Sequence, residues 1–212
     1  MTTRLRRTAG AGRRPALRLP VAATGLCALA ALALTGCGEG HSGASGNGSG
    51  AQGSAPDGWG TLATKSVDVS YPKSGAAGYT EESAAERGKA AAAAVRTDKG
   101  VKVSTITVQL DFTRARSADE AAIGAEAQVQ LGATLQGTRK VSLSGAADAR
   151  RVDFTFTSSG RAHTPPKGSR VHGVILTGLD SAKKTFAVRV DAQQGVLPDA
   201  DLKDIIDSIE VH

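Results

Sequence analysis

The 212-residue sequence predicts an α+β fold, a single domain over residues 59–212 with a mostly antiparallel sheet covered by helices, an α/β/α sandwich. Short segments alternate apolar and polar residues with the period of two that half-buried strands show. Two further segments carry helix start signals and apolar residues at helical spacing. No period of 20 to 50 residues repeats, which excludes solenoids and propellers.

The domain should begin with two short strands, at residues 61–65 and 67–71. In the second, Val67, Val69 and Tyr71 alternate with polar residues, as in a strand with one buried face. Pro72 should end it, because proline has no amide hydrogen to donate.

A helix is expected next, over residues 80–96. Thr80 is placed as its cap and acidic residues follow in its first turn. Gly88 weakens its middle. The Ala-rich part, residues 89–95, should pack on the sheet, with a partner-binding surface as the alternative.

The clearest strand pattern covers residues 101–112. One face holds four apolar residues, Ile106, Val108, Leu110 and Phe112. Val101 and Val103 have the opposite parity, so the side-chain phase changes near Ser104. We expect a bulge or similar irregularity there.

A capping box, Ser117 with Glu120, predicts a helix running to about Leu131. Four successive antiparallel strands should follow, at residues 139–143, 149–157, 170–177 and 185–191. Pro198 and Asp199 then open a closing helix whose buried face holds Leu202, Ile205, Ile206 and Ile209.

The N-terminal segment has the layout of an export signal. Six arginines and no acidic residue come first, followed by a charge-free stretch from residue 19 to 38. The apolar part ends in four residues, Leu34, Thr35, Gly36 and Cys37. This quartet resembles the lipobox of bacterial lipoproteins.

The lipobox resemblance implies that the chain is cut before Cys37 and that a diacylglyceryl group is attached to its sulfur. Residues 1–36 would then be a signal peptide, and the domain would lie on the outer face of the cytoplasmic membrane. An uncleaved membrane helix is the alternative, because about 18 apolar residues could nearly span a bilayer. Cys27 is a poor alternative as the lipidated cysteine, since Leu26 precedes it where a small residue is expected. Arg13 and Arg14 leave a twin-arginine route open, without the specific residues that should follow them.

Charge and cysteine content exclude two classes of protein. Six of the 26 Lys and Arg residues precede Cys37, which leaves 20 to balance the 20 Asp and Glu residues. A nearly neutral processed chain gives no reason to expect a nucleic-acid partner. With Cys27 removed and Cys37 lipidated, no disulfide is expected, so the core must stabilise the domain.

Residues 37–58 begin with the lipidated cysteine and continue with Gly and Ser at most positions. This composition is typical of a flexible tether. A Gly-rich coil of about 20 residues has an end-to-end distance of roughly 25 Å, enough to hold a small domain near the membrane surface.

A family resemblance rests on three short motifs: Tyr71-Pro72 at a strand end, the helix start from Ser117 to Glu120, and the closing run from Asp204 to Ile209. In this order they resemble the LpqN-type lipoproteins of actinobacteria, whose domain is similar to the PsbP and Mog families. The resemblance implies an α/β/α sandwich used for docking, and it supplies no catalytic residues.

No pattern for catalysis, metal or cofactor binding stands out. His163 and His172 lack metal-ligand spacing. A hydrolytic triad of Ser158 or Ser159 with His163 and Asp153 would be a chance combination, because no nucleophile-elbow motif is present. We therefore expect no cofactor, no metal and no enzymatic activity.

The segment from residue 158 to 170 is the best candidate for partner contact. It concentrates positive charge, with no acidic residue, at Arg161, His163, Lys167 and Arg170. Anionic headgroups or an acidic partner would suit it. The alternative is that this segment is an ordinary solvated hairpin loop. Arg114 and Arg116 form a second small basic cluster, for which a solvated loop is likewise the alternative.

Together these features predict a non-enzymatic docking module of the cell envelope, attached to the membrane through Cys37 and contacting an envelope protein or lipid. A carrier of a small hydrophobic or glycolipid ligand is the main alternative. A carrier would need a pocket of a few hundred Å3 between sheet and helices. An envelope hydrolase is a third possibility, and it would need a nucleophile and a base within hydrogen-bond reach.

Overall fold

The structure is a computed structural model that describes residues 56–73, 78–129, 132–161 and 165–212, all within one compact unit. The predicted signal peptide, the Leu34, Thr35, Gly36 and Cys37 quartet and nearly all of the linker lie outside the described residues. Neither helix in the described ranges has the length and apolar character needed to span a bilayer.

The largest element is a seven-stranded antiparallel sheet with the strand order β3-β4-β5-β9-β8-β7-β6. Its strands are β3 (Thr80–Glu81), β4 (Ala92–Asp98), β5 (Val101–Leu110), β6 (Thr134–Val141), β7 (Ala149–Thr157), β8 (Arg170–Leu179) and β9 (Thr185–Gln193). A small sheet, β1-β2-β10, consists of β1 (Trp59–Ala63), β2 (Val67–Pro72) and β10 (Glu210–Val211). The predicted α+β class with mostly antiparallel pairing is confirmed.

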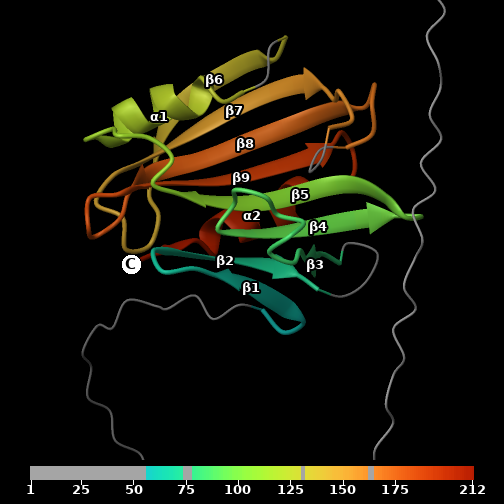
Figure 1. The fold of residues 1–212 in the computed structure, drawn as a ribbon, viewed down its shortest axis with the longest axis horizontal. Helices are drawn as coiled ribbons and strands as arrows, with labels where there is room; N and C mark the ends of the chain where they lie inside the picture. Colours follow the sequence, from blue (N-terminus) through green and yellow to red (C-terminus); the bar gives the residue numbers. More distant parts are fainter. Residues whose placement is uncertain (1–55, 74–77, 130–131, 162–164) are drawn as a thin grey trace, which may run out of the picture. The chain divides into compact units, whose positions relative to one another are not determined.

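The two described helices, α1 (Ala118–Glu126) and α2 (Asp199–Asp207), lie on opposite faces of the large sheet (Figure 1). The face under α1 holds the smaller apolar cluster, centred on Val152, Phe154 and Ile175. The face toward α2 holds the main core, and the small sheet completes that layer. One outer layer of the sandwich is therefore a helix together with a sheet.

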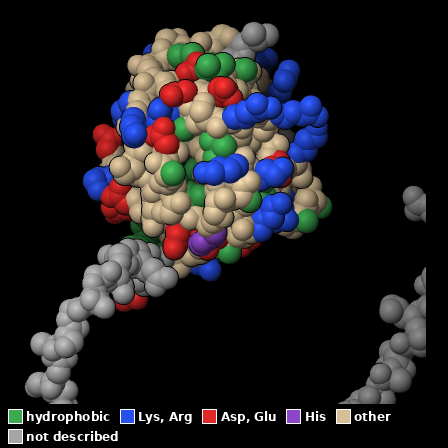
Figure 2. Space-filling model, turned by 90° about the vertical axis from the view of Figure 1, so that its left-hand side faces the viewer, with side chains coloured by type: hydrophobic (Ala, Val, Ile, Leu, Met, Phe, Trp, Pro, Cys, Tyr) green, Lys and Arg blue, Asp and Glu red, His purple; other side chains and the backbone are tan. Residues whose placement is uncertain are grey.

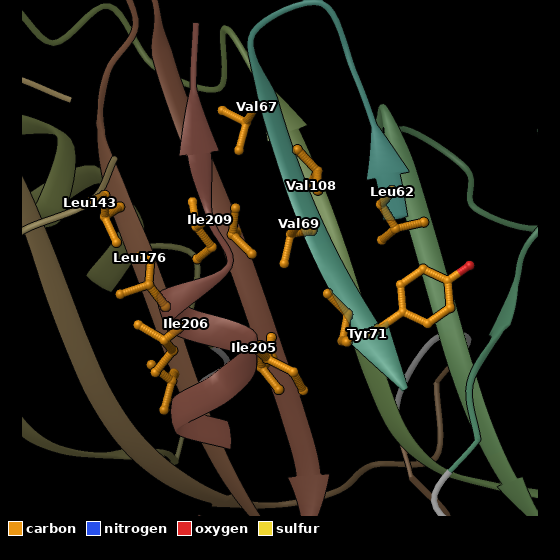
Figure 3. Close-up of a cluster of buried hydrophobic side chains, with 14 of the residues drawn as sticks. Leu62, Val67, Val69, Tyr71, Val108, Leu143, Leu176, Ile205, Ile206 and Ile209 are labelled. Atoms are coloured by element: carbon orange, nitrogen blue, oxygen red, sulfur yellow. The ribbon is translucent and has the colours of Figure 1, made fainter. Parts of the chain in front are cut away.

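The main core fills the space between the two sheets (Figure 3). Ile205 and Ile209 are almost completely buried there, beside Val69 of β2 and Leu176 of β8. The predicted apolar face of the closing helix is thus confirmed.

Residues after α2 are bound to two other parts of the chain, β2 and the segment after β6. The Ser208 hydroxyl accepts a hydrogen bond from the Ser70 amide at 2.9 Å, which ties the helix end to β2. β10 pairs with β2, and the Val211 amide donates to the Ser144 carbonyl at 2.8 Å. Gly145 has a φ of +74°, and a Cβ there would lie 1.8 Å from the Val211 carbonyl oxygen, so only glycine fits this approach.

The expected helix over residues 80–96 is wrong. Thr80 lies in β3, a turn-rich segment follows, and the Ala-rich part is β4, paired with β5. Ala has the highest helix propensity, but the difference from other residues is only about 0.5 kcal/mol per residue. Here Ala92, Ala93 and Ala94 are at most 2% exposed, so cross-strand bonding and burial on both faces outweigh propensity.

Other local predictions are confirmed. On β5, Lys102 pairs with Thr97 and Ser104 pairs with Arg96, so Val103 is the extra residue that shifts the side-chain phase. The Ser117 hydroxyl caps α1 by accepting from the Glu120 amide at 3.2 Å. Two boundaries differ from the prediction by several residues: α1 ends at Glu126 rather than at about Leu131, and β6 begins at Thr134 rather than at Arg139.

Replacing Ile205 by Ala should lower the free energy of unfolding by about 2–5 kcal/mol, because a buried branched chain is removed from a close-packed core. Ile123 offers a matched control, since it is also helical but is 66% exposed. Its replacement by Ala should change stability by less than about 0.5 kcal/mol. Urea unfolding of both variants tests the expectation, and equal effects would contradict the core assignment.

Candidate functional site

A groove of about 700 Å3 opens between the large sheet and the N-terminal end of α2. Beneath it lie three buried apolar residues, Val174 of β8 with Val190 and Ala192 of β9, which are at most 6% exposed. Leu197 and Leu202 add an apolar wall on the helix side. The volume falls within the range of small-molecule sites, about 300–1,000 Å3.

Two hydrogen bonds fix the turn between β9 and α2, which forms one side of the groove. The Gln194 amide donates to the Arg170 carbonyl at 2.9 Å, which attaches the turn to the start of β8. From β4, the Arg96 Nη1 donates to the Val196 carbonyl at 2.6 Å. Because both strand anchors belong to the large sheet, the groove is a preformed feature of the fold.

The rim of the groove is polar. Gln136 of β6 and Thr155 of β7 stand on the sheet side, with Arg170 and His172 of β8. Asp199, the first residue of α2, stands on the helix side. Among the described residues, the exposed Arg170 has no ion-pair partner, so its guanidinium is available to a ligand.

Beside the groove, the same sheet face carries more guanidinium than carboxylate. Asp153 accepts hydrogen bonds from Arg139 at 2.8 Å and from Arg151 at 2.6 Å. The His172 Nε2 lies 3.8 Å from the same carboxylate. One carboxylate shared by two arginines leaves a net positive charge on this part of the face.

Only part of the predicted contact segment reaches the groove. Arg170 lines it, whereas Arg161 and Lys167 are exposed and do not. His163 lies outside the described residues. The sequence singles out His172 only as an unsuitable metal ligand. Its period-two relation to Arg170 on one strand is the signal that places both side chains on the same face.

Ser158 has a structural role in that segment. Its side chain is buried, its hydroxyl donates to the Pro165 carbonyl, and it accepts from the Gly160 amide at 3.1 Å. Asp153 is held by its arginines. Within the described residues, these two side chains are therefore engaged elsewhere and do not form a nucleophile and base pair.

Arg114 and Arg116 lie at the opposite end of the sheet, on the exposed loop between β5 and α1. Figure 2 shows that end, where acidic side chains stand among the basic ones. Ion pairs such as Arg150 with Asp119 and Lys184 with Asp111 neutralise much of the charge there. In the part of the chain that the structure describes, no three His, Cys, Asp or Glu residues group as metal ligands.

A second polar cluster lies on the α1 face. Asp191 is almost fully buried, and its Oδ2 accepts from the Arg189 Nε at 2.8 Å. Its Oδ1 lacks a hydrogen-bond partner among the described residues. The Arg189 guanidinium in turn lies 5.0 Å from the centre of the Phe154 ring. Burial raises the pKa of Asp191, and the Arg189 charge offsets only part of that rise.

Comparisons with known proteins give two structural likenesses. No protein-family model matches the chain, and no curated protein matches its sequence. A crystal structure of LpqN from Mycobacterium tuberculosis, described as involved in cell envelope biogenesis, is 16% identical with a TM-score of 0.43, over 74% of this chain and 80% of that one. A protein of unknown function from Pseudomonas aeruginosa, described as a putative regulator, is 14% identical with a TM-score of 0.35, over 68% and 90% of the two chains.

Replacing Asp191 by Asn should change how stability depends on pH. The pKa of Asp191 is raised in the folded state, so this carboxyl stabilises the wild type most at pH values below its unfolded pKa of about 3.9. That contribution to stability is lost as pH rises through the folded-state pKa. Asn stays neutral, so the variant should gain stability relative to wild type as pH rises from about 4 to about 7. Urea unfolding across this range measures the difference. The variant also loses its pairing with Arg189, which adds an offset to the stability difference between variant and wild type. A stability of the variant relative to wild type that falls as pH rises would contradict the expectation.

Proposed function

We propose that this protein is a lipid-anchored binding module of the cell envelope, with no enzymatic role. Its binding site is the groove between the large sheet and the N-terminal end of α2, called the α2 groove below. The observation that carries the anchoring is the sequence Leu34, Thr35, Gly36 and Cys37 at the end of a charge-free stretch. A domain on a linker from Cys37 would work beside the outer face of the cytoplasmic membrane.

The binding role is supported by the groove. It has the volume of a small-molecule site, its wall is fixed by hydrogen bonds to two strands, and Arg170 at its rim has no ion-pair partner among the described residues. Fixed geometry lowers the entropy cost of binding. The groove also favours the second candidate function, a carrier of a small amphiphilic or hydrophobic ligand, because its volume suits such a molecule.

Replacing Cys37 by Ser should release the protein from the membrane, because the acylated thiol is lost. The matched control is Cys27→Ser, which removes the other thiol in the chain and should leave anchoring intact. Cell fractionation and metabolic labelling with an alkyne-tagged fatty acid measure both. Equal labelling of wild type and the Cys37 variant would contradict the anchor.

A photocrosslinking amino acid at Gln194, an exposed groove residue, should capture a discrete envelope component in intact cells. The same amino acid at Ile123, exposed on the opposite face of the sheet, is the control for accidental contact. Electrophoresis and mass spectrometry identify the products. Identical products at both positions would argue against the groove as the binding site.

A further inference from the structure

The open surface of the α2 groove is mostly polar. Its aliphatic strand and helix residues contribute little of that surface, since Val174, Val190 and Leu202 are at most 7% exposed. The groove residues that are exposed or half-buried carry mainly amide, hydroxyl, imidazole and charged groups. A ligand must therefore be polar itself, because it would otherwise leave these hydrogen-bonding groups unpaired.

Two opposite charges stand on opposite sides of the groove. Arg170, the first residue of β8, lines the sheet side, and Asp199, the first residue of α2, lines the helix side. Both residues are exposed, and among the described residues neither forms an ion pair, with the other or with a third group. Because the two charges belong to separate elements and do not neutralise each other, each is available to a ligand.

The neutral polar side chains of the groove match the hydrogen-bonding groups of a peptide backbone. Gln136 and Gln194 are exposed, and Thr155 is half-buried. An amide side chain donates and accepts hydrogen bonds, as a peptide group does. The volume of about 700 Å3 falls within the range of small-molecule sites. A short peptide therefore suits the groove in size and in hydrogen bonding.

We propose that the α2 groove binds short peptides as zwitterions, with the α-carboxylate of the peptide at Arg170 and its α-ammonium at Asp199. This inference rests on the proposed function, since it takes the groove as the binding site. A guanidinium binds a carboxylate, and a carboxylate binds an ammonium, through charge-assisted hydrogen bonds. A ligand with a single charge would leave one side of the groove without a counter-charge, so electrostatic complementarity favours a molecule that carries both.

The test is calorimetric titration of the full-length protein in detergent micelles with tri-alanine. At about pH 6 the free ammonium of this peptide is protonated and its free carboxyl is ionised. N-acetyl tri-alanine lacks the ammonium, and tri-alanine amide lacks the carboxylate. We expect tri-alanine to bind at millimolar or lower concentration, and each blocked peptide to bind about tenfold more weakly, the loss that follows from removing one charge-assisted hydrogen bond.

Two variants assign the two ends of the peptide. Arg170→Gln should weaken the binding of tri-alanine about tenfold and remove the difference between tri-alanine and its amide. Asp199→Asn should weaken it about tenfold and remove the difference between tri-alanine and its N-acetyl derivative. The matched controls are Lys167→Gln and Asp204→Asn, which remove exposed charges outside the groove and should leave all affinities unchanged.

The outcomes separate this inference from the proposed function. Equal binding of the three peptides, or a groove variant without effect, would overturn the zwitterion and leave the groove as a binding site. No binding of any of the three at millimolar concentration, together with a protein captured specifically at Gln194, would overturn the peptide ligand and retain a docking role. No binding and no specific capture would overturn both.

Discussion

The fold depends on one packing constraint: residues 199–211 must pack on the large sheet beside β2, where they complete the layer that the small sheet begins. Ile205 and Ile209 meet apolar side chains of β2 on one side and of the large sheet on the other. β1 and β2 alone form a two-stranded ribbon, which is marginally stable in water, so the small sheet depends on these residues and on its packing against β4 and β5. Burial of this segment thus joins the two halves of the main core. The Ser70 amide donates to the Ser208 hydroxyl and the Val211 amide donates to the Ser144 carbonyl, which sets the register of the segment.

The groove is a consequence of where this segment begins. Leu202 is the first buried residue of α2, so the helix covers the sheet only from that point on, and a hollow remains between the sheet and the exposed start of the helix. The turn before α2 cannot close this hollow, because Arg96 and the start of β8 hold the turn in place. The same packing that completes the core therefore leaves a groove with a polar rim beside it.

Most of the strands could be predicted from the sequence, because alternation is a local signal that one buried face imposes. The Ala-rich strand β4 could not, since alanine gives no contrast between faces and its propensity favours a helix. The phase change at Val103 was visible because branched apolar residues stood on both sides of it. The groove brings together Gln136, His172 and Leu202, which are far apart in the sequence, so no local pattern could reveal it; only Arg170 was identified, through its charge.

The pairing of β2 with β10 also sets the order of events when the protein is made. Residues 67–72 and 210–211 are neighbours in one sheet although nearly the whole domain lies between them in sequence. A chain that emerges N-terminus first, from a ribosome or through an export channel, exposes Val67, Val69 and Tyr71 long before their partners appear. Folding of the domain must therefore follow complete emergence, and until then these apolar side chains depend on chaperones or on transient collapse to avoid aggregation.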